Sequence, residues 1–231
     1  MRFVLLHSPL LGASGWRSVA ADLARRGYVA ETPAWPRLST IGGEFYAALT
    51  ASVAATLAGG ERAILVAHSG AGALVPALAA RIAPSVAGVI FADAILPHPG
   101  LSWFGTAPAA LREQLRAGAL SGELPRWADW WPPGALARLV PDPAVLAQMT
   151  AELEPIPVAY FEERAPSLDL TAPAAYLQLS AAYGEEAALS GQYGWCKARL
   201  PLHHLAMLTH PEAIADALEL LAAELAGAAH G

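Results

Sequence analysis

The chain has 231 residues, of which 55% are hydrophobic and 15% are charged, and its formal net charge at pH 7 is −6. A chain of this length and composition forms one domain, with or without an insertion, and is neither disordered nor fibrous. The acidic balance and the lack of a basic stripe exclude nucleic acid as an expected partner, and no apolar run reaches the roughly 18 residues of a membrane span.

The first 96 residues alternate between predicted strands and helices. Strands are expected over 3–7, 28–32, 63–67 and 86–92, and helices over 14–26, 44–57 and 71–82. The strands are continuously apolar rather than alternating, which is typical of a parallel sheet with helices on both faces.

This alternation stops at residue 97. Residues 97–173 are rich in proline and hold four of the seven tryptophans. Strands resume over 175–179 and 195–200, and a last helix is expected over 211–225. We therefore predict an α/β fold, a six-stranded and mostly parallel sheet formed by 1–96 and 174–231. A helical cap, 97–173, is inserted between the fourth and fifth strands, where it would cover the ligand-binding edge of the sheet.

Ser69 lies between a predicted strand and a predicted helix, in the stretch Ala67-His68-Ser69-Gly70-Ala71-Gly72. A nucleophile elbow needs a serine on such a turn, with small residues two positions before and after it. Ala67 and Ala71 meet that need, and the Gly70 N–H is placed to donate to an oxyanion. The alternative is an ordinary serine that caps a helix.

Three stretches together resemble the α/β-hydrolase superfamily, most closely its small branch of plant-type esterases and hydroxynitrile lyases. They are residues 5–12 with Trp16, the Ser69 turn, and residues 204–209 before the last helix. The resemblance implies the fold and a serine nucleophile with a histidine base. It matches His204 to that base, in preference to the adjacent His203, and His7 to a structural histidine of the family.

The acid of the catalytic triad is the least determined member. The resembling family usually carries an Asp after the strand that corresponds to 175–179, but no carboxylate stands there at the expected spacing. Asp93, at the end of the fourth strand, is a position that some members use instead. We favour Asp93 over Glu185 or Glu186, which come slightly later in a predicted helix.

The oxyanion hole departs from the family pattern. Pro9 occupies the position whose N–H the family normally uses, and proline has no N–H. Either the Leu10 N–H or the Ser8 hydroxyl replaces that donor, and a Thr hydroxyl of hydroxynitrile lyases matches the position of Ser8. Alternatively, Pro9 only stiffens a turn.

The remaining expectations concern ligands and surroundings. Substrate contacts are expected from His7, Pro9, His68, Trp103 and Trp130. Neither a metal-ligand spacing nor a phosphate or dinucleotide motif occurs, so no metal and no cofactor are expected. The single cysteine, Cys196, and the lack of a recognisable signal peptide favour the cytoplasm. The oligomeric state is left open, a homodimer included.

Three functions fit these residues. The first is a serine hydrolase that acts on a carboxylic ester, lactone or thioester of an apolar small molecule, with Ser69, His204 and Asp93 as triad. The second is a lyase, cyclase or dehydratase in which Ser69 and His204 only move protons. The third is a non-catalytic binding protein on the same scaffold.

Overall fold

The computed structural model describes residues 1–57, 61–83 and 85–228. Six strands form its main sheet, in the order β2-β1-β3-β4-β7-β8. These strands are β1 (Arg2–Leu6), β2 (Val29–Glu31), β3 (Ala63–Ser69), β4 (Val86–Ala94), β7 (Ala174–Gln178) and β8 (Cys196–Arg199). All neighbouring pairs run parallel, so the predicted six-stranded sheet is confirmed.

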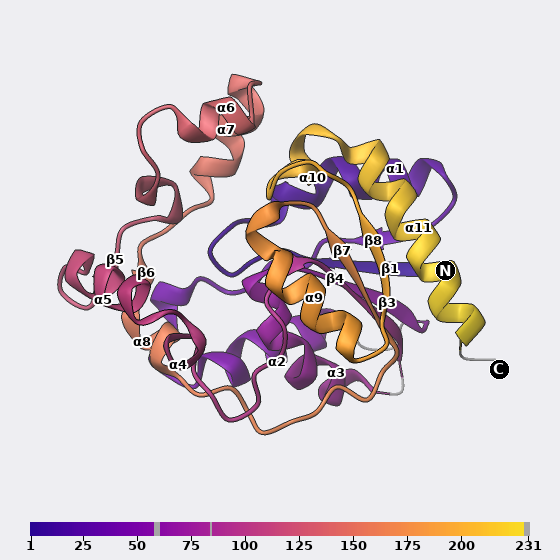
Figure 1. Ribbon diagram of the computed structural model, residues 1–231, viewed down its shortest axis with the longest axis horizontal. Helices are drawn as coiled ribbons and strands as arrows, with labels where there is room; N and C mark the ends of the chain where they lie inside the picture. The colour runs from indigo at the N-terminus through magenta and orange to yellow at the C-terminus, as the bar shows by residue number, and fades with distance from the viewer. Residues whose placement is uncertain (58–60, 84, 229–231) are drawn as a thin grey trace.

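Helices cover both faces of this sheet (Figure 1). One face carries α1 (Arg17–Arg25), α10 (Ala206–Thr209) and α11 (Pro211–Ala228), and the other carries α2 (Phe45–Leu57), α3 (Val75–Ile82) and α9 (Gly184–Gln192). Side chains of successive strand residues point to opposite faces. Leu5 accordingly joins the hydrophobic cluster that contains Leu218 of α11, whereas Leu6 joins the cluster that contains Leu49 of α2.

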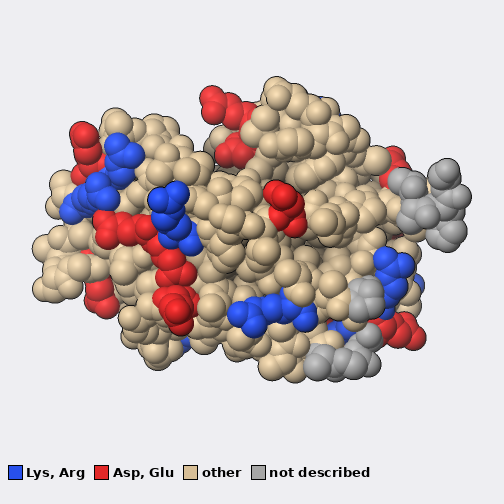
Figure 2. Space-filling view, turned by 90° about the horizontal axis from the view of Figure 1, so that it is seen from below, with Lys and Arg blue, Asp and Glu red and all other residues tan. Residues whose placement is uncertain are grey.

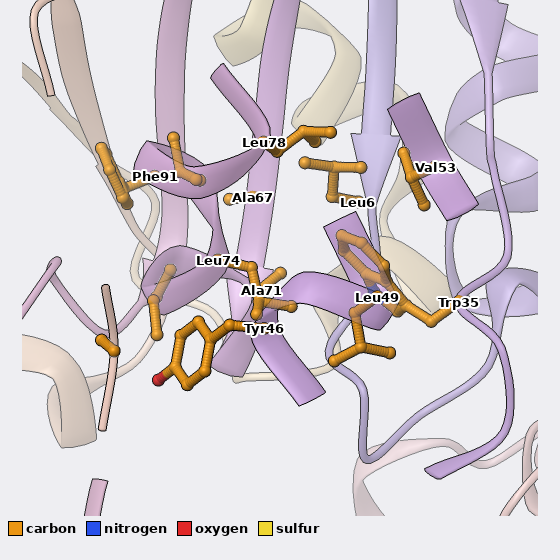
Figure 3. Packing of buried hydrophobic residues seen from close by; sticks show 14 of the residues in the cluster. Leu6, Trp35, Tyr46, Leu49, Val53, Ala67, Ala71, Leu74, Leu78 and Phe91 are labelled. Atoms are coloured by element: carbon orange, nitrogen blue, oxygen red, sulfur yellow. The ribbon is translucent and has the colours of Figure 1, made fainter. Parts of the chain in front are cut away.

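The cluster on the α2 side lies directly beneath the Ser69 turn. Figure 3 shows Leu6 and Ala67 from adjacent strands packed with Leu74 and Leu78 from the segment that follows Ser69. All four side chains are fully buried. Because burial of a leucine contributes roughly 1.5–3 kcal/mol, this packing gives the turn a rigid base.

Residues 97–173 connect β4 to β7 and lie at one end of the sheet (Figure 1). They form α4 (Trp103–Thr106), α5 (Ala109–Gly118), α6 (Ala135–Leu139), α7 (Pro143–Ala151) and α8 (Val158–Glu162), and an antiparallel pair, β5 (Glu123–Leu124) with β6 (Ile156–Pro157). That strand pair is not predicted from the sequence. Glu163 joins the segment to the sheet layer, because its carboxylate accepts hydrogen bonds from the N–H groups of Phe45 and Tyr46 at the start of α2.

Two strands, β3 and β4, extend slightly farther than predicted at their carboxyl ends, whereas the other four strands of the sheet end one residue earlier. β3 continues to Ser69 and β4 to Ala94, so Ser69 and Asp93 both belong to strand ends. Five 3₁₀ turns complete the described structure: η1 (Ala13–Trp16), η2 (Leu38–Thr40), η3 (Gly70–Leu74), η4 (Trp127–Trp130) and η5 (Ala181–Tyr183). The predicted helices over 14–26 and 71–82 both begin with such a turn.

The surface carries few charges. Figure 2 shows one face, on which several basic and acidic side chains lie side by side at the left and broad uncharged areas cover much of the rest. Among the helices that the structure describes, none has both the length and the apolar character to cross a bilayer.

Candidate active site

Ser69 lies on a strained turn between β3 and η3. Its backbone angles are φ 55° and ψ −126°, a conformation that non-glycine residues rarely adopt. Gly72 permits this turn, because a Cβ on it would lie 1.9 Å from the backbone oxygen of Ile95, the residue that follows β4. The turn therefore has the shape that a nucleophile elbow requires, and Ser69 remains partly exposed on it.

Asp93 lies at the end of β4, also with a positive φ of 45°. Its side chain is fully buried and accepts hydrogen bonds from the backbone N–H groups of Leu179 and Ser180, at 2.9 and 3.0 Å, and from the Ser180 hydroxyl at 2.6 Å. Nδ1 of His204 lies 2.9 Å from Asp93 Oδ2. Burial by itself raises the pKa of Asp93, but the hydrogen bonds from His204, Ser180 and Leu179 outweigh it and lower that pKa. An ionised carboxylate thus orients the His204 ring.

The other candidates from the sequence lie elsewhere. Glu185 and Glu186 belong to the first turn of α9, and in the described part of the chain no hydrogen bond joins either carboxylate to His204. His203 directs its Nε2 to the hydroxyl of Thr209, at 2.9 Å. The structure therefore brings Asp93 and His204 together and leaves these alternatives outside the site.

Two rings enclose the His204 imidazole. The His68 ring lies 4.5 Å away, and the Tyr183 ring is stacked almost parallel at 4.9 Å, with 7° between the planes. His68 is buried, and its Nε2 is 2.9 Å from the His204 carbonyl oxygen, to which it donates. Burial, reinforced by the nearby His204, holds the pKa of His68 well below its usual value, so this ring is neutral. From this position His68 holds the backbone of the His204 loop. The expected contact of His68 with substrate stays a prediction.

The turn after β1 lies against Gly70. The buried Ser8 Oγ accepts a hydrogen bond from the Leu10 N–H at 3.3 Å, and it is 3.2 Å from where a Cβ on Gly70 would be. The Leu10 N–H is thus already directed to Ser8, whose own hydrogen is left to donate. Of the two replacements considered for the donor missing at Pro9, this geometry favours the Ser8 hydroxyl.

A cavity of about 150 Å³ opens beside this turn. Pro9 and Leu10 line it from one side, Trp35 from the loop after β2, and Glu152 from the segment after α7. His7 also contributes to the lining, although most of its surface is buried, and burial lowers its pKa. His7 and Pro9, both predicted to contact substrate, therefore border open space beside the turn that follows β1.

The tryptophans predicted to contact substrate pack within the segment 97–173. Trp103 lies against Phe104 and Phe161, with ring centroids 5.8 and 4.9 Å apart. Trp130 contacts Phe161 and donates its indole N–H to the backbone oxygen of Pro125. Trp127 is nearer to His204, with ring centroids 6.5 Å apart. The spacing of the tryptophans along the sequence does not show which of them lies beside His204.

Tyr183 is a site residue that sequence reasoning missed. Its hydroxyl lies 3.2 Å from Ser69 Oγ, and in the described part of the chain the Ser69 side chain forms its hydrogen bond with this hydroxyl. Burial raises the pKa of Tyr183 to about 12. The available signal was its position shortly after β7, where the resembling family usually carries an Asp and this chain has no carboxylate at the expected spacing.

The residues described contain no group of three or more His, Cys, Asp and Glu side chains arranged to hold a metal ion. The arrangement that they do contain is a strained serine, a histidine oriented by a buried carboxylate, and hydroxyl and N–H donors beside the serine. These groups can support nucleophilic attack or proton transfer.

Comparison with known proteins identifies the architecture. A family model described as "Alpha/beta hydrolase family" matches residues 3–217. No curated protein sequence matches the chain significantly.

Solved structures match almost end to end. An extracellular α/β-hydrolase from a Paenibacillus species has a TM-score of 0.77 at 20% identity, with 94% of this chain and 97% of that chain covered. A pyrethroid hydrolase from Sphingobium faniae has a TM-score of 0.71 at 22% identity, with coverages of 96% and 97%. A tomato methylketone synthase I variant has a TM-score of 0.73 at 16% identity, with coverages of 97% and 98%. At these identities the likeness establishes the fold and leaves the reaction open.

Proposed function

The chain belongs to the α/β-hydrolase family, and we propose that it is a serine hydrolase that cleaves a carboxylic ester, lactone or thioester of an apolar small molecule. One observation carries the proposal. His204 is held at 2.9 Å by the buried carboxylate of Asp93, in the loop next to a serine with φ 55°. An imidazole whose Nδ1–H is bound to a carboxylate presents its Nε2 lone pair as a general base.

The proposed reaction has two halves. In the first, Ser69 Oγ attacks the acyl carbon while its proton passes to His204 Nε2. The bond from the acyl carbon to the leaving oxygen or sulfur then breaks, and that atom takes the proton from His204. In the second, water attacks the acyl-enzyme, His204 takes its proton, and the carbon–Oγ bond breaks as that proton returns to Ser69. The Gly70 N–H and the Ser8 hydroxyl donate to the oxyanion in both halves.

An apolar substrate fits the surroundings of the site. Trp127 lies close to His204, and Leu10 and Trp35 line the adjacent cavity of about 150 Å³. The lining of this cavity also includes the charged residues Arg37, Glu152 and Glu154, so the preference for an apolar substrate rests on Trp127, Leu10 and Trp35 and not on the whole cavity. The proposed activity falls in EC class 3.1, which includes esterases and thioesterases, so esters and thioesters are the first substrates to screen.

The first test is mass spectrometry after treatment with a fluorophosphonate probe, on the wild type and on His204→Ala. We expect one adduct on Ser69 in the wild type and none in the variant. A folded wild type that stays unlabelled would refute an activated nucleophile. A panel of p-nitrophenyl esters and acyl thioesters of increasing chain length then defines the substrate class.

A second candidate function is a lyase, cyclase or dehydratase that uses Ser69 and His204 for proton transfer. The specific observation in its favour is the bond from Ser69 Oγ to Tyr183, together with the donor missing at Pro9. A rapid burst of p-nitrophenol from an activated ester requires an acyl-enzyme and favours the hydrolase. Turnover of an elimination or cyclisation substrate without such a burst favours the second candidate.

A further inference from the structure

One side chain, Tyr183, touches both reacting members of the site. Its hydroxyl oxygen lies 3.2 Å from Ser69 Oγ, and its ring is stacked on the His204 imidazole at a centroid distance of 4.9 Å and an angle of 7°. The classical roles of nucleophile, base, acid and oxyanion donor are filled by other residues. Tyr183 therefore requires an explanation of its own.

The carboxylate that orients His204 also positions Tyr183. Ser180 is bound to Asp93 through its backbone N–H and its hydroxyl, and the turn η5 leads directly from Ser180 to Tyr183. The Gln178 side chain fixes the Ser180 carbonyl with a hydrogen bond of 3.0 Å. Asp93 thus holds the base with one oxygen and the start of the tyrosine turn with both.

The direction of the Tyr183–Ser69 hydrogen bond follows from the number of hydrogens. The Ser69 hydroxyl has one hydrogen, which the proposed reaction passes to His204. Burial, with the charges of Asp93 and Glu186 in support, raises the pKa of Tyr183 to about 12 although its bond to Ser69 lowers it, so the phenol keeps its proton near neutral pH. The phenol is then the donor and Ser69 Oγ the acceptor.

On the basis of the proposed hydrolase function, we propose that Tyr183 is a catalytic residue that promotes release of the acyl group from Ser69. In deacylation, the bond between the acyl carbon and Oγ breaks, and its electron pair goes to Oγ. The proton that His204 took from water is delivered to the same oxygen. The phenol donates a hydrogen bond to Oγ as negative charge develops there, and its own proton is not transferred.

The two halves of the reaction depend differently on this bond. In acylation Oγ is the attacking atom, and a donor on its lone pair draws electron density away from the nucleophile. In deacylation Oγ is the leaving atom, and the same donor stabilises it. Loss of the hydroxyl is therefore expected to slow deacylation selectively, whereas the stacked ring supports the His204 imidazolium in both halves.

The test is stopped-flow kinetics with p-nitrophenyl acetate on the wild type, Tyr183→Phe and Tyr193→Phe. The Phe substitution at 183 keeps the ring and removes only the hydroxyl. Tyr193 is 59% exposed and packs on Trp195 outside the site, so its variant is the matched control. Hydrogen bonds to a developing charge predict a steady-state rate about 10- to 100-fold lower in Tyr183→Phe.

The expected signature is a full burst of p-nitrophenol in Tyr183→Phe, followed by the slowed steady state, with acetyl-Ser69 accumulating in intact-protein mass spectra. The control should match the wild type. Equal deacylation rates in the wild type and Tyr183→Phe would overturn the inference alone, as would an equal fall of the burst and steady-state rates. A wild type that forms neither a fluorophosphonate adduct nor an acetyl adduct would overturn the proposed function, and this inference with it.

Discussion

Replacement of Asp93 by Asn tests the central pair of the site. Oδ1 of Asp93 accepts from two backbone N–H groups, of Leu179 and Ser180, so the amide oxygen of Asn is expected to take that position. The NH₂ group then replaces Oδ2 and faces His204 Nδ1. His204 must turn its Nδ1 lone pair to that donor and carry its proton on Nε2, where it no longer accepts the proton of Ser69.

The expected cost of Asp93→Asn is a fall in kcat of about 10⁴, equivalent to about 5.4 kcal/mol of transition-state stabilisation. The fold should lose only about 1.5–3 kcal/mol, because hydrogen bonds to a charged group become bonds to a neutral one. The assay is kcat and KM for an activated ester, beside a thermal melt of each variant. Glu185→Gln and Glu186→Gln serve as controls and should have little effect. A folded Asp93→Asn variant within about 10-fold of wild-type kcat would refute the reasoning, and a large loss in either Glu variant would move the acid to that residue.

Three further predictions follow from the same structure. Ser8→Ala should lower kcat on the same ester by about 10²–10³ with little change in KM, because the substitution removes an oxyanion donor. An unchanged kcat would assign that role to the Leu10 N–H. Gly72→Ala should lower the free energy of unfolding, measured by denaturant titration, by at least about 3 kcal/mol, because its Cβ would lie 1.9 Å from the Ile95 oxygen. Gly118→Ala is the control: a Cβ there has no neighbour within 4 Å, so its free energy of unfolding should stay within about 1 kcal/mol of wild type. Burial lowers the pKa of His68 from its ordinary value of 6.5, so below that pH the unfolded chain binds more protons than the folded chain. The contribution of the neutral His68 to the free energy of unfolding is therefore complete above pH 6.5 and decreases as the pH falls below it. Thermal melts between pH 5 and 8 should therefore show a shallower pH dependence for His68→Gln than for wild type, and parallel curves would contradict the assignment.

Much of the fold could be predicted from the sequence because its strands are buried on both faces. A continuous apolar run such as 63–67 has few alternatives to a central parallel strand, and the helix that follows it fixes the connection. The turn at Ser69 could be predicted from the small residues around it, because only small side chains fit where β3 and η3 pack closely against their neighbours. Gly72 shows how strict that fit is.

The contacts of the site were harder to predict, because they join segments far apart in the chain. Asp93 and His204 are separated by 111 positions, and Ser69 and Tyr183 by 114. Spacing could place a carboxylate at a strand end but could not show that Ser180 would bind it. It also could not tell Trp127, beside His204, from Trp130, which packs on Phe161.

The proposed position of the acid, at Asp93, accounts for the contacts of the segment after β7. With the carboxylate at the end of β4 rather than after β7, the segment after β7 no longer has to supply a charge. It supplies polar contacts instead: the Leu179 N–H and the N–H and hydroxyl of Ser180 donate to Asp93 and lower its pKa, and the Tyr183 hydroxyl lies 3.2 Å from Ser69 Oγ. On this proposal, the lack of a carboxylate at the expected spacing after β7 and the hydroxyl beside Ser69 are two features of one segment, 179–183.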